Sequence, residues 1–318
     1  MKFAQRTAFL LLLAGLGVSP AFAISSAVNL STRMLVQTGD NVLIGGFIIS
    51  GTGQKRIVVR ALGPSLPVPG ALADPTLELH DASGHIIVSN DNWRTSQQDA
   101  LINAGYAPTN DLESALITTV GPGAYTAIVR GVNGTSGVGL VEVFDLDPPG
   151  ASARLGNISA RGNVLTDDNV MIGGFIVSGD VSKKMLMRVR GPSLYLNGVL
   201  IPGSLLDPNL ELHDGNGAII ASNDNWRGPQ EAEINASTLA PTDDREPAII
   251  ATLPQGPFTA IVRGTKNTTG IALLEMYDLD LPPQADGSTL FISQLRAQNG
   301  SGSLGSGTAT LRLAADEK

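Results

Sequence analysis

Short apolar runs separated by turn residues dominate this chain. Residues 125–130 read YTAIVR and residues 77–80 read LELH, so apolar and polar positions alternate with the period of a half-buried strand. The intervening segments are rich in Gly, Pro, Asn and Asp, which favour turns. In the first half of the chain this pattern predicts strands at residues 30–36, 42–50, 56–61, 76–80, 85–89, 115–120, 125–130 and 139–146.

Helical character in this half is confined to residues 95–104. Seven or eight short strands with one short helix are typical of an antiparallel β-sandwich or jelly roll. An α/β fold would need helices of about 10–15 residues between the strands. The sequence therefore predicts an all-β fold.

Two copies of one unit make up most of the chain. The segment VLIGGFIISG at residues 42–51 returns as VMIGGFIVSG at residues 170–179, which is 128 positions later. The segment SNDNWR at residues 89–94 returns at residues 222–227, which is 133 positions later. The second copy therefore carries five extra residues, around positions 196–205. Copies of this length are large enough for whole domains, so we expect two tandem antiparallel, jelly-roll-like β-sandwich domains.

Proline pairs mark the ends of the two copies, at Pro148-Pro149 and Pro282-Pro283. Proline cannot continue a central strand and stiffens a linker, so these pairs are natural boundaries. The expected organisation is a signal peptide at 1–23, a first repeat at 28–147, a linker at 148–156, a second repeat at 157–281, a linker at 282–288 and an incomplete third β module or tail at 289–318.

The first 23 residues have the pattern of an export signal. A basic start is followed by an apolar stretch and by Ala21-Phe22-Ala23, a small-residue cleavage pattern. The alternative is a membrane anchor, but the apolar stretch is short for a bilayer. No later apolar window is long enough to span one, so we expect no transmembrane segment after cleavage. An exported chain without cysteine is typical of bacteria, and we expect a periplasmic, cell-surface or extracellular location.

Composition excludes several classes of function. The chain has 29 acidic and 21 basic side chains, a net charge of −8, and no basic run, so nucleic acid is not an expected partner. The absence of cysteine excludes thiolate metal sites, disulfides and cysteine nucleophiles. Hydrolase motifs such as G-x-S-x-G and H-E-x-x-H do not occur.

The candidate metal ligands in this sequence are oxygen atoms of Asp and Asn side chains. Calcium takes six to eight oxygens from carboxylates, amides and backbone, and each copy offers an aspartate turn facing an Asn-Asp-Asn loop. The candidate ligands are Asp81, Asn90, Asp91 and Asn92 in the first copy, and Asp214, Asn223, Asp224 and Asn225 in the second. The alternative is that these side chains only cap turns. Glu113 and Glu246 either complete such a site or lie on the surface.

Two tryptophans follow these loops, Trp93 and Trp226. An exposed tryptophan beside polar groups can stack on a sugar ring, so both are candidate ligand-binding residues. The alternative is that each indole plugs the end of its sandwich. His80 and His213 occupy equivalent positions and are candidates for a general base or a metal ligand; the alternative is that they are solvent-facing residues at strand ends. We expect no catalytic residue and no enzymatic activity.

The second half of each copy resembles the bacterial pre-peptidase C-terminal type domain. The resemblance rests on a D-x-x-G turn between two strands, the NDNW segment and a later strand that reads YTAIV or FTAIV. It covers about 70 residues of each copy and implies a β-sandwich of exported or surface proteins. Residues 289–318, which contain GTATL, resemble the opening of a CHRD-type module, a β domain of secreted proteins.

These observations lead to one expectation about function. We expect a non-catalytic exported bacterial surface or extracellular protein that acts as a structural, adhesive or binding module, with Ca²⁺ as a candidate stabiliser. The expected partners are polysaccharide or other cell-surface proteins. The alternative is a carbohydrate-binding accessory region of a secreted hydrolase.

Overall fold

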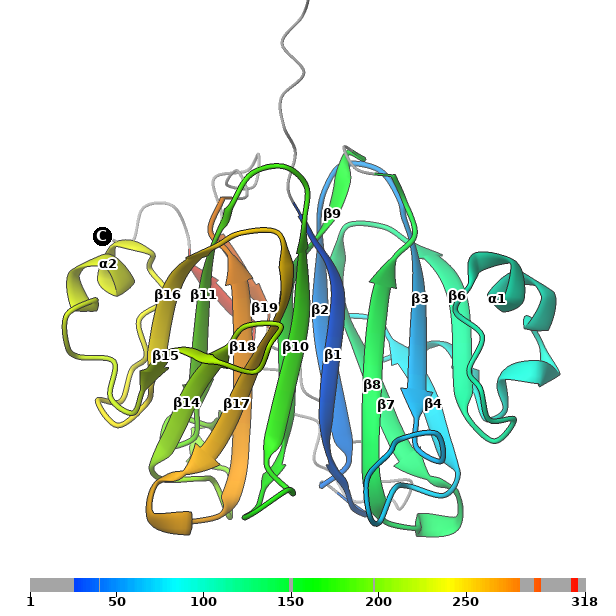
Figure 1. Ribbon diagram of the computed structural model, residues 1–318, viewed down its shortest axis with the longest axis horizontal. Coiled ribbons are helices and arrows are strands. Elements are labelled where there is room, and N and C mark those ends of the chain that lie inside the picture. The colour runs from blue at the N-terminus through cyan, green and yellow to red at the C-terminus, as the bar shows by residue number, and fades with distance from the viewer. Residues whose placement is uncertain are drawn as a thin grey trace, which may run out of the picture.

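The computed structural model describes residues 26–39, 41–148, 151–196, 198–280, 289–292 and 310–313. The expected all-β class is confirmed: two eight-stranded antiparallel sheets pack together as a sandwich (Figure 1). The expected signal peptide and both linker proline pairs, apart from Pro148, lie outside the described residues. Among the described residues no helix is long and apolar enough to cross a membrane.

Eight strands form the first repeat, and their positions follow the predicted ones closely. They are β1 (Ser26–Val36), β2 (Leu43–Gly51), β3 (Lys55–Leu62), β4 (Pro75–His80), β5 (Ile86–Asn90), β6 (Ser114–Val120), β7 (Gly123–Gly131) and β8 (Gly137–Asp145). The short helix α1 (Gln98–Ala104) follows a 3₁₀ turn, η1 (Trp93–Thr95), within the segment that has helical character, and a second 3₁₀ turn, η2 (Val132–Gly134), precedes β8.

The second repeat uses the same order of elements. Its elements are β9 (Ala153–Val164), β10 (Met171–Ser178), β11 (Lys183–Arg190), β14 (Pro208–His213), β15 (Ile219–Asn223), α2 (Glu231–Ala236), β16 (Ala248–Leu253), β17 (Gly256–Gly264), η3 (Thr265–Asn267) and β18 (Gly270–Asp278). The five-residue insertion forms a small hairpin, β12 (Tyr195–Leu196) with β13 (Val199–Leu200). In the tail, β19 (Thr289–Ile292) pairs with β20 (Thr310–Leu313).

Both sheets run through both repeats. One sheet has the order β15-β14-β17-β10-β1-β8-β3-β6 and the other β16-β11-β18-β9-β2-β7-β4-β5. Exchanging equivalent strands of the two repeats turns one order into the other, so the repeats are related by a pseudo-two-fold axis. The strand β1 pairs with β10, and β2 pairs with β9; we call these two pairings the seam (Figure 1). The strand β9 begins at Ala153, inside the segment expected to be linker.

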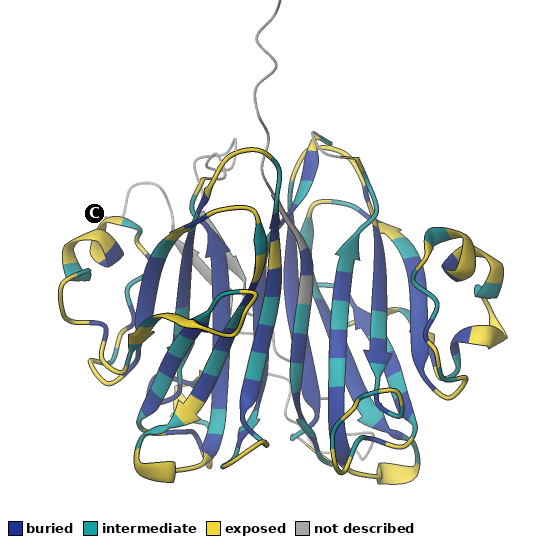
Figure 2. Cartoon of the chain, viewed as in Figure 1, coloured by how far each residue is buried: buried dark blue, intermediate teal, exposed yellow. Residues whose placement is uncertain are grey.

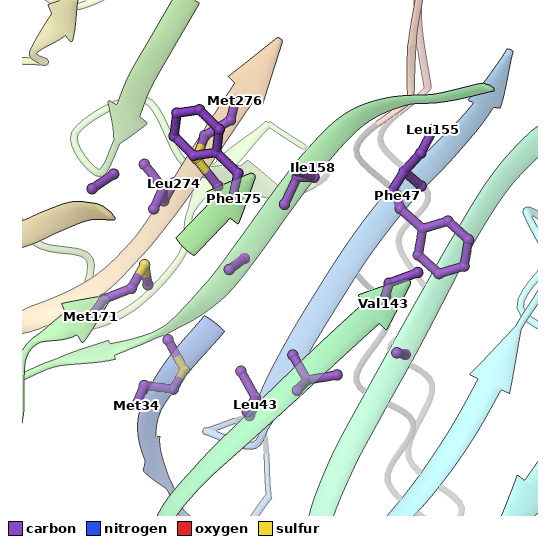
Figure 3. Packing of buried hydrophobic residues seen from close by; sticks show 14 of the residues in the cluster. Met34, Leu43, Phe47, Val143, Leu155, Ile158, Met171, Phe175, Leu274 and Met276 are labelled. Carbon is purple, nitrogen blue, oxygen red and sulfur yellow. The ribbon is translucent and has the colours of Figure 1, made fainter. Parts of the chain in front are cut away.

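One hydrophobic core fills the sandwich on both sides of the seam. Met34 of β1 and Phe47 of β2 belong to the same buried cluster as Met171 and Phe175 of β10 and Ile158 of β9 (Figure 3). Strand residues alternate between this core and the outer faces, as the LELH pattern predicts. Because the core and the ladders are continuous, the two repeats form one body (Figure 2).

Each repeat also carries a smaller apolar cluster on the outer face of its terminal strands. In the first repeat Trp93 and Leu101 of the η1–α1 segment cover Val58 of β3 and Ala115 of β6. The equivalent cluster in the second repeat contains Trp226 and Ile234, and α1 and α2 lie at opposite ends of the molecule (Figure 1).

Candidate functional site

The Asn-Asp-Asn loops hold the edges of the two sheets together. The Asn90 amide oxygen accepts the backbone N–H of Ala115 at 3.0 Å, and its amide nitrogen donates to the Asn92 carbonyl at 3.2 Å. Asn223 makes the equivalent contacts in the second repeat. These amides therefore join β5 to β6, and β15 to β16, across the sandwich.

Asp81 lies at the other end of the β4–β5 hairpin, where its side chain stabilises the turn. Its carboxylate accepts the backbone N–H groups of Ser83 at 2.8 Å and His85 at 2.9 Å, and Asp214 does the same in the second repeat. Asn90 pairs with Leu77, four residues before Asp81, which places the two side chains about 13 Å apart along the strand. The expected single site containing Asp81 and the Asn-Asp-Asn loop does not form, and by equivalence neither does the one containing Asp214.

The Asn-Asp-Asn loop instead lies beside Asp74, a residue that the sequence analysis overlooked. The Ser114 hydroxyl is 2.6 Å from the Pro75 carbonyl and 2.7 Å from the Asp91 carbonyl, so the two segments are adjacent. Burial, with the nearby charge of Asp91, raises the pKa of Asp74. Oδ1 of Asp74 and Oδ1 of Asn92 are buried without a hydrogen-bond partner among the described residues.

In the described part of the chain, no group of three or more His, Cys, Asp or Glu side chains is arranged so that it could hold a metal ion. Asp91 and Asp224 are exposed. Calcium binding stays a prediction, and the side chains that fit it best are those of Asp74, Asp91 and Asn92.

The two tryptophans are buried, so the expected stacking platform is absent at both positions. Trp93 is 2% exposed and Trp226 4% exposed. The Trp93 indole N–H donates to the Asn110 carbonyl at 3.1 Å, and the Arg94 guanidinium lies 4.1 Å from its ring centroid. Each indole packs beneath the helix segment of its repeat, so both are core residues, as the alternative interpretation expected, although they lie on the outer face of the sheet and not at the end of the sandwich.

The histidines hold the β4–β5 and β14–β15 hairpins. His80 is 4% exposed, and its ring nitrogens lie 3.1 Å from the Gly84 carbonyl and 3.1 Å from the Glu78 carboxylate. His213 repeats these contacts with Gly217 and Glu211. A solvent-facing position was therefore the wrong interpretation for His80, because its ring ties the turn to the strand.

Glu113 and Glu246 were expected on the surface or at a metal, but both are fully buried. Glu113 Oε1 accepts the backbone N–H groups of Gly63 and Ser65, each at 3.0 Å, and also the Ser65 hydroxyl. Glu246 accepts the equivalent amides of Gly191 and Ser193 at 2.9 Å. The repeated GPSL segment is thus a loop tied down by a distant carboxylate.

The Gly-Gly pair that is repeated in both copies marks the seam, and the sequence analysis did not use this signal. A Cβ on Gly46 of β2 would lie 2.5 Å from the Ser159 hydroxyl of β9, and a Cβ on Gly174 of β10 would lie 2.5 Å from the Ser31 hydroxyl of β1. These are directly paired residues of the two repeats. Glycine at these positions allows the serine side chain of the opposing strand to lie over the backbone.

A pocket of about 400 Å³ opens where the two repeats meet, and we call it the seam pocket. Its lining comes from β1, from the loop after β3, from the start of β8 and from the turn between β9 and β10. The lining residues are Arg33, Pro67, Val68, Pro69, Val138, Asp167, Asp168 and Asn169. The volume is in the usual range for small-molecule sites, which often lie at domain interfaces.

The acidic wall of the seam pocket is a well-fixed turn. Asn169 N–H donates to the Thr166 carbonyl at 3.1 Å, and Leu165 N–H donates to the Asn169 carbonyl at 3.1 Å. Asp167 has a φ of +57°, in the left-handed region where the equivalent turn of the first repeat has Gly39. The Arg263 guanidinium donates to the Asp167 carbonyl at 3.5 Å. The second repeat therefore has a carboxylate where the first has none.

Comparisons with known proteins name no relative that would identify the site. No family model matches the chain, and no curated protein matches it. Among solved structures it is similar to a DUF4785 family protein from Legionella pneumophila, with a TM-score of 0.23 and 9% identity over 86% of this chain and 68% of that one. It is also similar to PNGF-II, with a TM-score of 0.21 and 8% identity over 80% of this chain and 59% of that chain. Likenesses this weak carry no argument about function.

Proposed function

We propose that this protein is a non-catalytic exported bacterial protein of the cell surface or extracellular space, acting as a structural, adhesive or binding module. One observation carries the proposal: the histidines that the sequence offers as general-base candidates, and the glutamates beside the Asn-Asp-Asn loops, are engaged in holding the scaffold. His80 ties a hairpin turn to its strand, and Glu113 ties down the loop that contains Ser65. The second repeat uses His213 and Glu246 in the same way.

The arrangement of the repeats supports a scaffold role. Sheets and core pass through the seam, so the relative orientation of the repeats is fixed by two strand pairings rather than by a linker. A pocket built from both repeats is then held by ladder hydrogen bonds on either side. A site on such a rigid frame loses little conformational entropy when it binds.

Export and bacterial origin rest on the sequence. The basic, apolar and small-residue pattern of residues 1–23 supports export, and the absence of cysteine supports a bacterial source. Polysaccharide and other cell-surface proteins stay the expected partners. Stabilisation by calcium is a separate proposal that a thermal melt tests.

A retention assay with a chemical readout tests this function. The purified full chain is immobilised and exposed to extracellular polysaccharides and to intact bacterial cells, and both retention and released reducing ends or peptides are measured. We expect retention without product. Product release that is lost in the His80→Gln, His213→Gln double variant would overturn the proposal. If the assay shows no retention and no product, the role is limited to a structural one.

The carbohydrate-binding alternative relied on exposed tryptophans. Because Trp93 and Trp226 are buried, the structure gives this alternative no aromatic platform at those positions. Retention on polysaccharides alone, with none on intact cells, would favour this alternative in the same assay.

A further inference from the structure

We propose that the seam pocket binds a small zwitterion, a molecule that carries one carboxylate and one ammonium group beside an aliphatic side chain. A free apolar amino acid or the end of a short apolar peptide has this chemistry. The inference rests on the proposed binding role and names the ligand class of that module.

The cationic group of the pocket is Arg33. It lies on the outward side of β1, between the core residues Thr32 and Met34, and is half-buried. Within the described part of the chain its guanidinium has no hydrogen-bond or ion-pair partner, although the equivalent Arg161 of β9 is 7% exposed and does have a partner. A partly desolvated guanidinium binds a carboxylate through two parallel hydrogen bonds, and this pairing is stronger than at a fully exposed site.

The anionic groups of the lining are on the turn between β9 and β10. Asp167 and Asp168 are exposed on the β9–β10 turn, and Thr166 donates its hydroxyl to the Asp167 carboxylate at 3.1 Å. Asp168 has no partner among the described residues. An ammonium group has three donors and no acceptor, so two neighbouring carboxylates and the Asn169 amide oxygen suit it well.

Charge decides between a zwitterion and a purely anionic ligand. Arg33 contributes one positive charge, while Asp167 and Asp168 contribute two negative charges. The whole chain is acidic as well, with a net charge of −8. A polyanion such as an acidic polysaccharide would be repelled by the wall and by this wider field. A zwitterion pairs each of its charges with an opposite one.

The rest of the lining is apolar and selects the side chain of the ligand. Val68 and Val138 also line the pocket, together with Pro67 and Pro69. The loop that carries Val68 is fixed to β8, because Val138 N–H donates to the Gly70 carbonyl at 2.8 Å and Leu72 N–H donates to the Val138 carbonyl at 2.8 Å. An aliphatic side chain of the ligand would bury its surface against these residues.

The pocket belongs to one side of the pseudo-two-fold axis. On the other side the loop after β11 is five residues longer and forms the β12–β13 hairpin, and Gly39 replaces Asp167. The two repeats have therefore diverged in the loop after β3 and at Asp167, while Arg33, Asp168 and Asn169 have identical counterparts in the other copy.

Calorimetric titration of the full chain with three matched compounds tests the ligand class. L-Leucine has both charges, 4-methylpentanoate lacks the ammonium group, and 3-methylbutylamine lacks the carboxylate. We expect leucine to bind at least tenfold more tightly than either of the others. Leucyl-leucine distinguishes a peptide ligand from a free amino acid. Equal affinity for leucine and 4-methylpentanoate, or no binding of any compound at millimolar concentration, would overturn the assignment.

Variants of the lining residues test whether leucine binds in the seam pocket. Arg33→Gln and Asp168→Asn should each weaken leucine binding about tenfold or more, and Val68→Trp, which fills the pocket, should abolish it. Arg56→Gln, on an exposed side chain of β3, is the matched control and should leave binding unchanged. Asp168 is exposed, so its variant folds even if that of Arg33 is unstable. Unchanged binding in Asp168→Asn and Val68→Trp would place the ligand elsewhere, and the outcome of the retention assay would still decide the proposed function separately.

Discussion

Glu113 Oε1 accepts hydrogen bonds from both the backbone amide and the hydroxyl of Ser65, 48 residues earlier in the chain. The same oxygen also accepts the amide of Gly63, so one fully buried carboxylate organises the whole GPSL loop. This loop continues into Val68 of the seam pocket. Glu113, directly before β6, thus fixes a loop that continues into a lining residue of the seam pocket.

Removing this carboxylate should destabilise the fold. Glu113→Ala leaves the amides of Gly63 and Ser65 buried without an acceptor, and we expect a loss of about 3 kcal/mol in the free energy of unfolding. Denaturant titration measures it. Asp111→Ala, two residues away on a side chain that is 67% exposed, is the matched control and should change stability by less than about 0.5 kcal/mol. Equal effects of the two variants would mean that the loop does not depend on Glu113.

Trp93 should behave as a core residue. Trp93→Ala removes a side chain packed against Leu101 and Val58, and we expect it to cost about 3–5 kcal/mol. Arg94→Ala, which removes only the half-exposed guanidinium over the ring, should cost less than about 1 kcal/mol. If Trp93→Ala kept the wild-type stability and lost retention on polysaccharide, the stacking interpretation would be right after all.

The strands of this fold could be predicted from the sequence because each one has a buried face and is bounded by turn residues. The predicted strand at 125–130 lies within β7, and the predicted strand at 56–61 lies within β3. In the structure Arg60 of β3 lies opposite Glu142 of β8 and the two side chains form an ion pair, the kind of opposite-charge pair that stabilises neighbouring antiparallel strands.

The alternation of apolar and polar residues alone could not reveal the seam. Alternation in β1 shows which residues face a core, but the same alternation fits a neighbour from either repeat, so β10 was not identifiable as its partner. The burial of Glu113 was missed for a related reason. In the sequence, a lone glutamate after an aspartate looks like a surface acid. The backbone amides that donate hydrogen bonds to it come from a distant part of the chain, so its burial becomes evident only in the folded structure. The lining of the seam pocket comes from four separate segments, which no local motif connects.

The seam should make the two repeats unfold together. Gly46→Val and Gly174→Val place side chains where Ser159 and Ser31 lie, and we expect the double variant to lose about 2–4 kcal/mol through overpacking. Differential scanning calorimetry should show one transition for the wild type and a lower or split transition for the variant. Gly228→Val, where an added Cβ meets nothing within 4 Å, is the control. Two separate transitions in the wild type would contradict the shared core.

Calcium, if it binds, should depend on Asp74 and Asp91 and not on Asp81. Two carboxylates and one amide oxygen are few ligands for this ion, so we expect a rise in melting temperature only at millimolar Ca²⁺. Asp74→Asn and Asp91→Asn should each remove the rise. Asp81→Asn should lower the melting temperature by weakening its turn and yet keep the Ca²⁺-dependent rise. A rise that only Asp81→Asn abolishes would restore the site expected from the sequence.

Stability should also depend on pH through the pair formed by Glu78 and His80. The hydrogen bond from His80, with the charge of Arg130, lowers the pKa of Glu78 from 4.5 to about 2, so this stabilisation is complete above pH 4.5 and is lost as the pH falls toward 2. The same hydrogen bond raises the pKa of His80 above 6.5, so that contribution is complete below pH 6.5 and is lost as the pH rises through the raised value.

Both shifts come from the same pair, which is therefore fully formed between about pH 4.5 and 6.5 and stabilises the fold by on the order of 1 kcal/mol after screening by solvent. Denaturant titrations from pH 2 to pH 9 should show a plateau in this window, and His80→Gln should flatten the decline on its alkaline side. His85→Gln, on a side chain that is 83% exposed, should keep the wild-type profile. An alkaline decline that persists unchanged in His80→Gln would show that a group other than this pair controls it.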